Sequence, residues 1–160
     1  MKINHYLRAL ILTFLFLFLV TSCGGKNIQF LDNEELFNSE WTLVSLIGNN
    51  TKVSGKDLTV KPTIQFIKQA NGTITVNGFS GINRFMGGTK IVGTTITPGN
   101  LATTRMAGSP EASKIEDLFL SIINHGGNYS IFEESKTKYM SIKNDVKKTE
   151  LLFESGKSLR

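Results

Sequence analysis

Residues 62–76 read Pro-Thr-Ile-Gln-Phe-Ile-Lys-Gln-Ala-Asn-Gly-Thr-Ile-Thr-Val, and this stretch sets the fold class. Two runs rich in β-branched and aromatic residues flank Asn71-Gly72, a pair that accepts the positive φ angles of a tight hairpin turn. Apolar and polar residues alternate along both runs, so each strand has one face to bury. Pro62 opens the first run, where its missing N–H does least harm. The stretch therefore predicts an antiparallel hairpin with one buried face.

Further short strands are expected on both sides of this hairpin. Residues 41–47 form an apolar, β-branched run that begins at Trp41 and is typical of a well-buried strand. Short strand segments separated by glycines follow over residues 84–104, and residues 129–132, 138–142 and 151–153 complete the set. Many short strands with turn residues between them favour a closed antiparallel sheet over βαβ units. We expect a mainly β, compact, barrel-like domain of about eight strands.

One helix is expected over about residues 110–125. Ser109 suits the N-cap, Pro110 the first helical position and Glu111 the positive end of the helix dipole. Apolar residues then recur at helical spacing on one face, and Lys114, Glu116, Asp117 and Ser121 are expected off that apolar stripe. The sequence predicts a single helix packed on the sheet.

The N-terminus resembles a bacterial export signal. A basic start with Lys2 and Arg8 precedes an apolar run over residues 9–20. Val20-Thr21-Ser22-Cys23 is similar to the lipobox of lipoproteins, in which the cysteine becomes the first residue and carries a diacylglyceryl lipid. The apolar run is shorter than the roughly 20 residues that span a bilayer. We expect lipid attachment at Cys23, although an ordinary signal followed by a free thiol is the alternative.

These features divide the chain into a signal peptide (1–22), a tether (23–39), one domain (40–155) and a short tail (156–160). Loss of residues 1–22 removes Lys2 and Arg8 and no acid, which leaves 138 residues with 16 bases against 13 acids. This mild positive charge gives no case for nucleic acid as a partner. Cys23 is the only cysteine, so the domain is expected to fold without a disulfide.

The sequence offers no catalytic or metal-binding motif that we recognise. His125 is the only histidine after residue 22 and falls at the expected end of the helix. Transition-metal sites use several His or Cys ligands, and the chain lacks them. The stretch around Gly78-Phe79-Ser80-Gly81 lacks both the Gly-x-Ser-x-Gly spacing of a nucleophile elbow and the Gly-Lys-Ser/Thr ending of a phosphate loop. We expect no enzyme activity, no cofactor and no metal.

Two central motifs resemble those of the META-domain (HslJ-like) family. Residues 76–87, Val-Asn-Gly-Phe-Ser-Gly-Ile-Asn-Arg-Phe-Met-Gly, look like that family's Gly-Cys-Asn-x-Phe/Tyr-x-Gly signature. Residues 103–111, Thr-Thr-Arg-Met-Ala-Gly-Ser-Pro-Glu, resemble its Thr-x-Met-Ala-Cys motif before a Glu-containing helix. The resemblance covers about residues 40–154 and implies a β-barrel-like domain with a packed helix. Family members are mostly envelope lipoproteins with loose links to stress responses, antibiotic resistance, motility or secretion.

The two cysteines of the family motifs are replaced in this chain. Ile82 and Gly108 occupy their positions, and the joint loss implies that the cysteines are normally bonded to each other. Ile82 is expected to recover part of the lost stability by apolar burial.

The resemblance implies a non-enzymatic, lipid-anchored envelope protein that acts as a binding or envelope-stress module. An inhibitor of an exported hydrolase, such as a lysozyme or protease, and a small-ligand-binding barrel are the alternatives. The expected binding surface consists of residues from the two motifs, Asn83, Arg84, Phe85, Thr104, Arg105 and Met106, unless these residues are purely structural. The expected partners are the membrane, through the lipid, and an envelope protein or small ligand. Gly24 lacks the charge of an inner-membrane retention signal, which favours the periplasmic face of the outer membrane in a Gram-negative cell.

Overall fold

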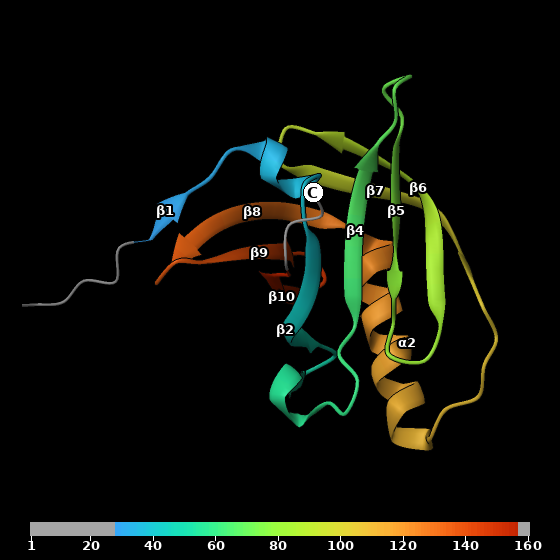
Figure 1. Cartoon of the computed structure of the whole chain (residues 1–160). Coiled ribbons are helices and arrows are strands. Elements are labelled where there is room, and N and C mark those ends of the chain that lie inside the picture. Colours follow the sequence, from blue (N-terminus) through green and yellow to red (C-terminus); the bar gives the residue numbers. More distant parts are fainter. Residues whose placement is uncertain (1–27, 157–160) are drawn as a thin grey trace, which may run out of the picture.

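The structure, a computed structural model, describes residues 28–156, and ten strands of this part of the chain form one antiparallel sheet (Figure 1). One α-helix and two short 3-10 helices accompany the sheet. The elements are β1 (Gln29–Phe30), η1 (Asn33–Leu36), β2 (Glu40–Gly48), β3 (Thr51–Ser54), η2 (Gly55–Asp57), β4 (Thr63–Lys68), β5 (Ile74–Phe79), β6 (Arg84–Val92), β7 (Thr95–Thr103), α2 (Pro110–His125), β8 (Gly127–Glu134), β9 (Thr137–Asn144) and β10 (Thr149–Ser155).

The sheet closes on itself. The strand order is β1-β8-β7-β6-β5-β4-β2-β10-β9. Strand β9, the last in this order, also pairs with β8, and this pairing closes the sheet into a ring. Eight strands therefore form the ring, while β1 is attached outside it on β8 and β3 on β2. The predicted barrel-like β fold with one helix is confirmed.

Apolar side chains fill the interior of the ring. Strand residues such as Ile64, Phe66 and Val76 are buried, as the alternation in the hairpin predicted. Phe119 of α2 lies edge-on to Phe85 of β6 at 5.9 Å between ring centroids, and to Phe153 of β10 at 6.4 Å. Edge-to-face contacts of this kind add to the stabilisation from burial. The helix thus bridges strands on different sides of the ring.

The helix has the predicted bounds. The Ser109 hydroxyl accepts a hydrogen bond from the Ala112 N–H at 3.2 Å, which satisfies one of the free donors of the first turn. Gly126 ends the helix with a φ of 61°, a conformation that favours glycine. The prediction of a single helix over residues 110–125 is confirmed.

Strands β6 and β7 are longer than the sequence predicted. Residues 84–104 were expected to form several short strands, but β6 and β7 are continuous over nine residues each. Gly87 and Gly88 lie inside β6, where the register with β7 shifts between Gly87 and Thr89. These glycines therefore mark a bulge within one strand rather than a turn between two.

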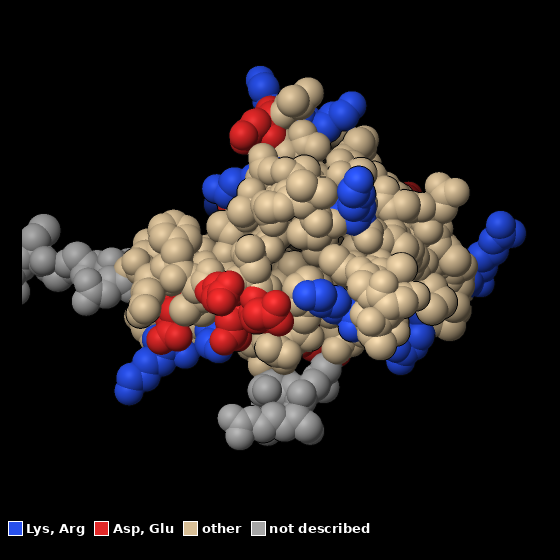
Figure 2. Space-filling view, turned by 90° about the horizontal axis from the view of Figure 1, so that it is seen from above, with Lys and Arg blue, Asp and Glu red and all other residues tan. Residues whose placement is uncertain are grey.

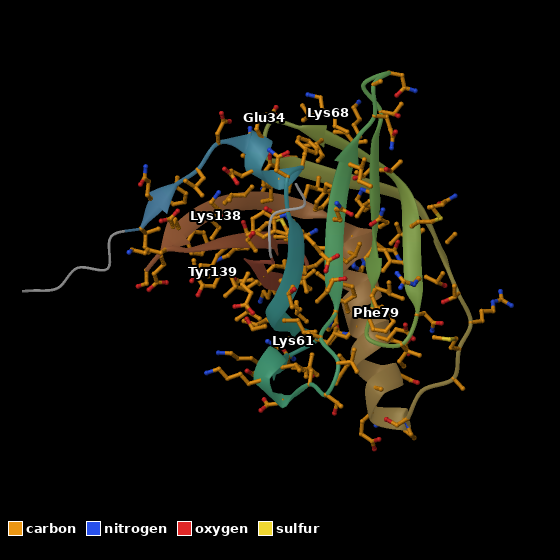
Figure 3. The ribbon with its side chains drawn as sticks, in the orientation of Figure 1. Glu34, Lys61, Lys68, Phe79, Lys138 and Tyr139 are labelled. Carbon is orange, nitrogen blue, oxygen red and sulfur yellow. The ribbon has the colours of Figure 1, made fainter. Side chains whose placement is uncertain are left out.

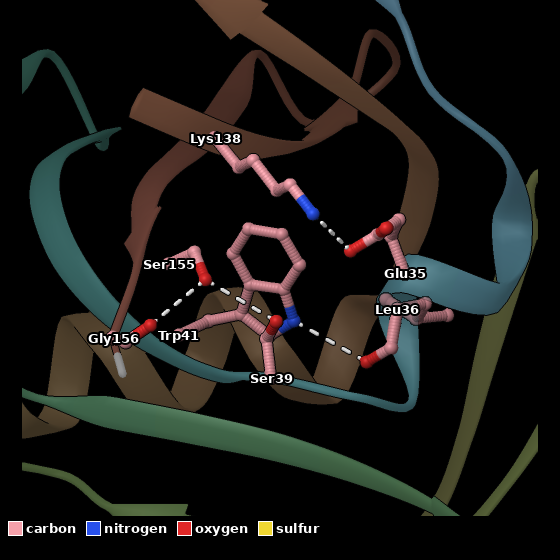
Figure 4. A network of polar contacts seen from close by, with 7 residues as sticks. All are labelled: Glu35, Leu36, Ser39, Trp41, Lys138, Ser155 and Gly156. Carbon is pink, nitrogen blue, oxygen red and sulfur yellow. Dashed lines mark hydrogen bonds and ion pairs between the residues drawn. The ribbon is translucent and has the colours of Figure 1, made fainter. Parts of the chain in front are cut away.

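The N-terminal segment before β2 is packed on the barrel (Figure 4). Leu36 is fully buried, and its carbonyl accepts a hydrogen bond from the Trp41 indole at 3.3 Å. Glu35 pairs with Lys138 of β9 at 2.7 Å, and Ser39 accepts a hydrogen bond from Ser155 of β10 at 3.2 Å. The tether predicted over residues 23–39 is corrected for residues 28–39, since Leu36 is buried in the core and Leu31 and Phe37 pack against it.

The predicted signal peptide and Cys23 lie outside the described residues, as do residues 157–160. Within residues 28–156, no helix has the length and hydropathy needed to cross a bilayer.

Candidate functional site

Asn83, in the turn between β5 and β6, connects the two sequence motifs. Its side-chain Oδ1 accepts hydrogen bonds from Thr104 Oγ1 at 2.9 Å and from the Met106 N–H at 2.7 Å. Its Nδ2 donates to Glu116 Oε2 at 3.1 Å and to the Met106 carbonyl at 3.3 Å. Because every polar atom of this amide is bonded, Asn83 fixes the segment after β7 against the β5–β6 turn.

Glu116 of α2 also takes part in this network, because its carboxylate bonds to residues of the β5–β6 turn. Its Oε1 accepts hydrogen bonds from the Asn83 N–H at 3.0 Å and from the Ser80 hydroxyl. Glu116 was expected off the apolar stripe of the helix, but it is buried beside Phe119 and Ile123. The correction follows from the spacing: Glu116 precedes these two residues by three and seven positions, which places all three on one helix face. The buried carboxylate is stabilised by N–H and O–H donors.

The six predicted surface residues divide into two groups. Asn83 and Phe85 are only 6% and 2% exposed, so they are not the exposed surface residues that the sequence predicted, and this part of the prediction is corrected. Phe85 belongs to the core, and Asn83 to the network above. The other predicted residues, Arg84, Thr104, Arg105 and Met106, are exposed.

A groove on the outer face of the sheet contains part of this surface. It has a volume of about 600 Å³. We call it the outer-sheet groove, and its lining residues are Glu40, Thr63, Gln65, Asn77, Gly78, Arg84, Phe85, Met86, Ala102, Thr103 and Thr104. Arg84 and Thr104 therefore lie at the groove, whereas Arg105 and Met106 follow it in the chain without lining it.

One row of cross-strand neighbours runs along the outer-sheet groove. Glu40 of β2 is opposite Gln65 of β4, Gln65 is opposite Asn77 of β5, and Asn77 is opposite Met86 of β6. Met86 is in turn opposite Ala102 of β7. Directly opposed residues point to the same face of a sheet. The groove is thus built across five strands that are adjacent in the sheet, of which β4 to β7 are also consecutive in the chain.

The next row along the strands borders the groove. Thr63 is opposite Phe79, and Phe79 is opposite Arg84. Phe79 lies at the end of β5, near the β5–β6 turn that Asn83 holds (Figure 3). The rigid turn therefore fixes the strand end from which Arg84 projects.

The comparison with protein families decides the family. The model of the META domain matches residues 34–157. The chain belongs to the META domain family. The resemblance of the two motifs is thereby confirmed, and the matched range includes the packed segment before β2.

The comparison with solved structures supports the fold, and the comparison with curated proteins gives no match. The chain is similar to an NMR structure of a protein from Burkholderia xenovorans, with a TM-score of 0.62, 24% identity, and coverage of 78% of this chain and 86% of that one. A second NMR structure has a TM-score of 0.50 and 20% identity, and covers 77% of this chain and 93% of that one. At these identities the likeness shows the META domain fold alone. No curated protein matches the chain.

Ile82 occupies the space that a second side chain at position 108 would need in this META domain. A Cβ added to Gly108 would lie 2.2 Å from Ile82 Cδ1. Ile82 is buried, so its larger side chain packs at the place where the family resemblance implies a disulfide. The two motifs are therefore held together by the Asn83 network and by apolar packing.

Four polar side chains of the outer-sheet groove are free to bind. Within residues 28–156, the side chains of Glu40, Gln65, Asn77 and Arg84 make no hydrogen bond or ion pair with another residue. Carboxylate, amide and guanidinium groups together offer both donors and acceptors. Glu40 and Arg84 carry opposite charges and come from strands on opposite sides of β4 and β5.

Other candidate chemistry is sparse in this META domain. His125 is exposed at the last position of α2. No group of three or more His, Cys, Asp or Glu side chains that could hold a metal occurs within residues 28–156.

Proposed function

We propose that this META domain is a non-enzymatic, lipid-anchored binding module of the cell envelope, and that the outer-sheet groove is its binding site. The observation that carries the proposal is the row of unpartnered polar side chains in a groove of about 600 Å³. Concave sites with a few converging polar groups are the usual form of a ligand site. The lipobox-like stretch ending at Cys23 supports the anchor.

The scaffold of the groove supports binding without large rearrangement. Its residues stand on paired strands, and the segment after β7 is fastened by Asn83 through Thr104 and Met106. Side chains on such rigid elements lose little backbone freedom when a ligand binds. Glu40 and Arg84 give the groove two ends of opposite charge, which would fix the direction of a polar ligand.

The two alternative functions have less support. A small ligand inside the barrel is disfavoured, because the cavity bounded by Phe66, Val76 and Ile142 has a volume of about 10 Å³, room for about one water. Inhibition of an exported hydrolase stays a prediction that an enzyme assay can test.

Site-specific photo-crosslinking of the full chain in living cells tests the groove. A photoreactive residue at Asn77 lies in the groove, whereas one at exposed Lys143 of β9 serves as the control. We expect a discrete crosslinked product from position 77 alone. Gln65→Ala combined with Arg84→Ala should reduce that product about tenfold, since loss of each 1.4 kcal/mol lowers affinity tenfold. The variant carrying Lys52→Ala is the control for a change of surface charge.

Equal products from both positions, or a product that survives the double substitution, would contradict a site in the groove. The anchor is tested separately by mass spectrometry of the membrane fraction. A diacylated Cys23 in the wild type, and a soluble protein after Cys23→Ser, are the expected results.

A further inference from the structure

A strip of apolar side chains crosses the outer face of the barrel where the described chain begins. Phe30 of β1 is opposite Phe132 of β8, and Phe132 is opposite Tyr139 of β9. These side chains share one face of the sheet. The Phe132 and Tyr139 rings are stacked at 5.5 Å between centroids. Together with Ile28, two residues before Phe30 in the chain, we call these residues the aromatic strip.

The aromatic strip is incompletely covered by the protein. Phe30 is 73% exposed and Ile28 is 53% exposed, so two large apolar side chains at the strip's end face solvent. Tyr139 lies on β9 near the place where β1 joins β8 (Figure 3). Aromatic rings with one polar edge are the side chains that favour the interface between lipid and water.

The position of the strip relative to Cys23 identifies what covers it. Ile28 is five positions after Cys23, and an extended chain covers at most about 3.6 Å per position, or about 18 Å in all. A lipid on Cys23 would therefore hold Ile28 close to the bilayer surface. We propose that the aromatic strip rests on the lipid bilayer and orients the anchored domain. This inference rests on the lipid anchor proposed above.

The charges around the strip indicate the kind of lipid surface. Glu134 follows Phe132 on the same face of β8, and Lys136 lies in the β8–β9 turn. Asp32 follows β1, Glu34 and Glu35 are in η1, and Glu35 is paired with Lys138, which precedes Tyr139 on β9. In the view from above, several acidic side chains lie close together, and a smaller acidic group lies apart from them (Figure 2). Because acids outnumber bases here, the strip fits a zwitterionic lipid surface better than an anionic one.

The same orientation keeps the outer-sheet groove accessible. In the ring of eight strands, β8 and β9 lie opposite β4 and β5, which carry Gln65 and Asn77 of the groove. Figure 1 shows β1 on the far side of the molecule from β4 and β5. A domain that lies with the aromatic strip on the membrane therefore turns its groove away from it.

Tryptophan fluorescence in vesicles tests the contact. Trp41 is the only tryptophan and is fully buried. The fluorescence of an added tryptophan is therefore obtained by subtracting the spectrum of the wild-type chain from that of the variant. The mature, lipidated chain with Phe30→Trp is reconstituted in phosphatidylethanolamine vesicles that contain brominated acyl chains. We expect a roughly twofold loss of the added fluorescence, as for a ring at the lipid interface. Replacing part of the lipid by anionic phosphatidylglycerol should weaken this quenching.

The matched control is Val146→Trp. Val146 is also exposed, at 90%, but it lies in the β9–β10 turn, more than about 17 Å along β9 from Tyr139. Its fluorescence should be unaffected by the brominated lipid. Equal quenching at both positions, or none at position 30 in a chain with acylated Cys23, would overturn the membrane contact and leave the anchor standing. An unacylated chain would overturn both, and quenching that grows with anionic lipid would overturn the preference for a zwitterionic surface.

Discussion

A single side chain, Asn83, connects the two sequence motifs to each other and to the helix. Its amide joins three parts of the chain, since it bonds to Thr104 and Met106 after β7 and to Glu116 in α2. Each of these bonds replaces one that water would supply in the unfolded chain. The net gain of each is small, but loss of the amide leaves several buried partners unsatisfied.

Substitution of Asn83 should therefore be costly. Asn83→Ala is expected to lower the free energy of unfolding by about 2–4 kcal/mol, because Glu116 Oε2 and the Met106 backbone lose the bonds to the Asn83 side chain. The control Asn77→Ala removes the same side chain at a position without an internal bond, and should change stability by less than about 0.5 kcal/mol. Urea unfolding measures both. Similar values for the two variants would rule out a stabilising role for the network.

Positions 82 and 108 allow a second test at the residue scale. Ile82→Cys with Gly108→Cys, in a chain that also carries Cys23→Ser, should form a disulfide and stabilise the domain by about 3 kcal/mol. Thiol titration and the melting temperature with and without reductant measure the effect. Gly108→Ala alone is the control, and it should destabilise the domain because its Cβ would meet Ile82. Two free thiols in the oxidised, folded double variant would contradict the prediction.

The residue scale is also where sequence reasoning reached its limit. The motif residues were identified, but a pattern of polar residues does not say which of them turn inward. Glu116 was missed although its spacing from Phe119 was visible, because a carboxylate on an apolar face is expected to point to solvent unless donors surround it. Those donors, on Ser80 and Asn83, come from another part of the chain.

Helix α2 and the hairpins were predictable at the scale of elements. Ser109, Pro110 and the glycine after His125 define the helix ends by local chemistry alone. Strands β6 and β7 were divided incorrectly, because a glycine has the same local signature in a turn and in a bulge. Only the cross-strand neighbour distinguishes the two.

The two glycines of the bulge should respond differently to substitution. A Cβ at Gly87 would lie 2.6 Å from the Asn100 carbonyl oxygen, while one at Gly88 would meet nothing within 4 Å. Gly87→Ala should destabilise the domain by about 1–3 kcal/mol through overpacking. Gly88→Ala should leave stability unchanged or raise it by up to about 1 kcal/mol, because alanine restricts the unfolded chain. Thermal unfolding compares them, and a reversed order would contradict the described register.

On the scale of the whole molecule, the sequence predicted the class of fold but not its boundary. The alternation of apolar residues specified a closed sheet with a filled interior. The folded part begins before the predicted domain, because Leu36 belongs to the core and its carbonyl is bonded to the Trp41 indole, although acids directly precede Leu36 in the sequence. The outer-sheet groove was equally hidden, since its row joins residues from five strands.

This boundary can be tested by a pair of substitutions in the N-terminal segment. Leu36→Ala removes a fully buried side chain and should lower the free energy of unfolding by about 2–5 kcal/mol. Phe30→Ala, at an exposed position of the same segment, should change it by less than about 0.5 kcal/mol. Chemical unfolding of the full chain measures both. A neutral Leu36→Ala would restore the interpretation of this segment as a tether.

The ring of strands is joined unevenly. Strand β8 pairs with β7 through only two opposed residue pairs, Thr95 with Asn128 and Ile96 with Gly127, whereas β8 and β9 are paired along their length. Local opening should therefore begin at this seam, and the Tyr129 amide, which donates to the Thr94 carbonyl across it at 2.8 Å, should exchange with solvent before the amides of β9. An opened seam exposes two unpaired strand edges on one molecule. Such edges can pair with the same edges of a second molecule, so the seam is the place where strand exchange between two copies would start.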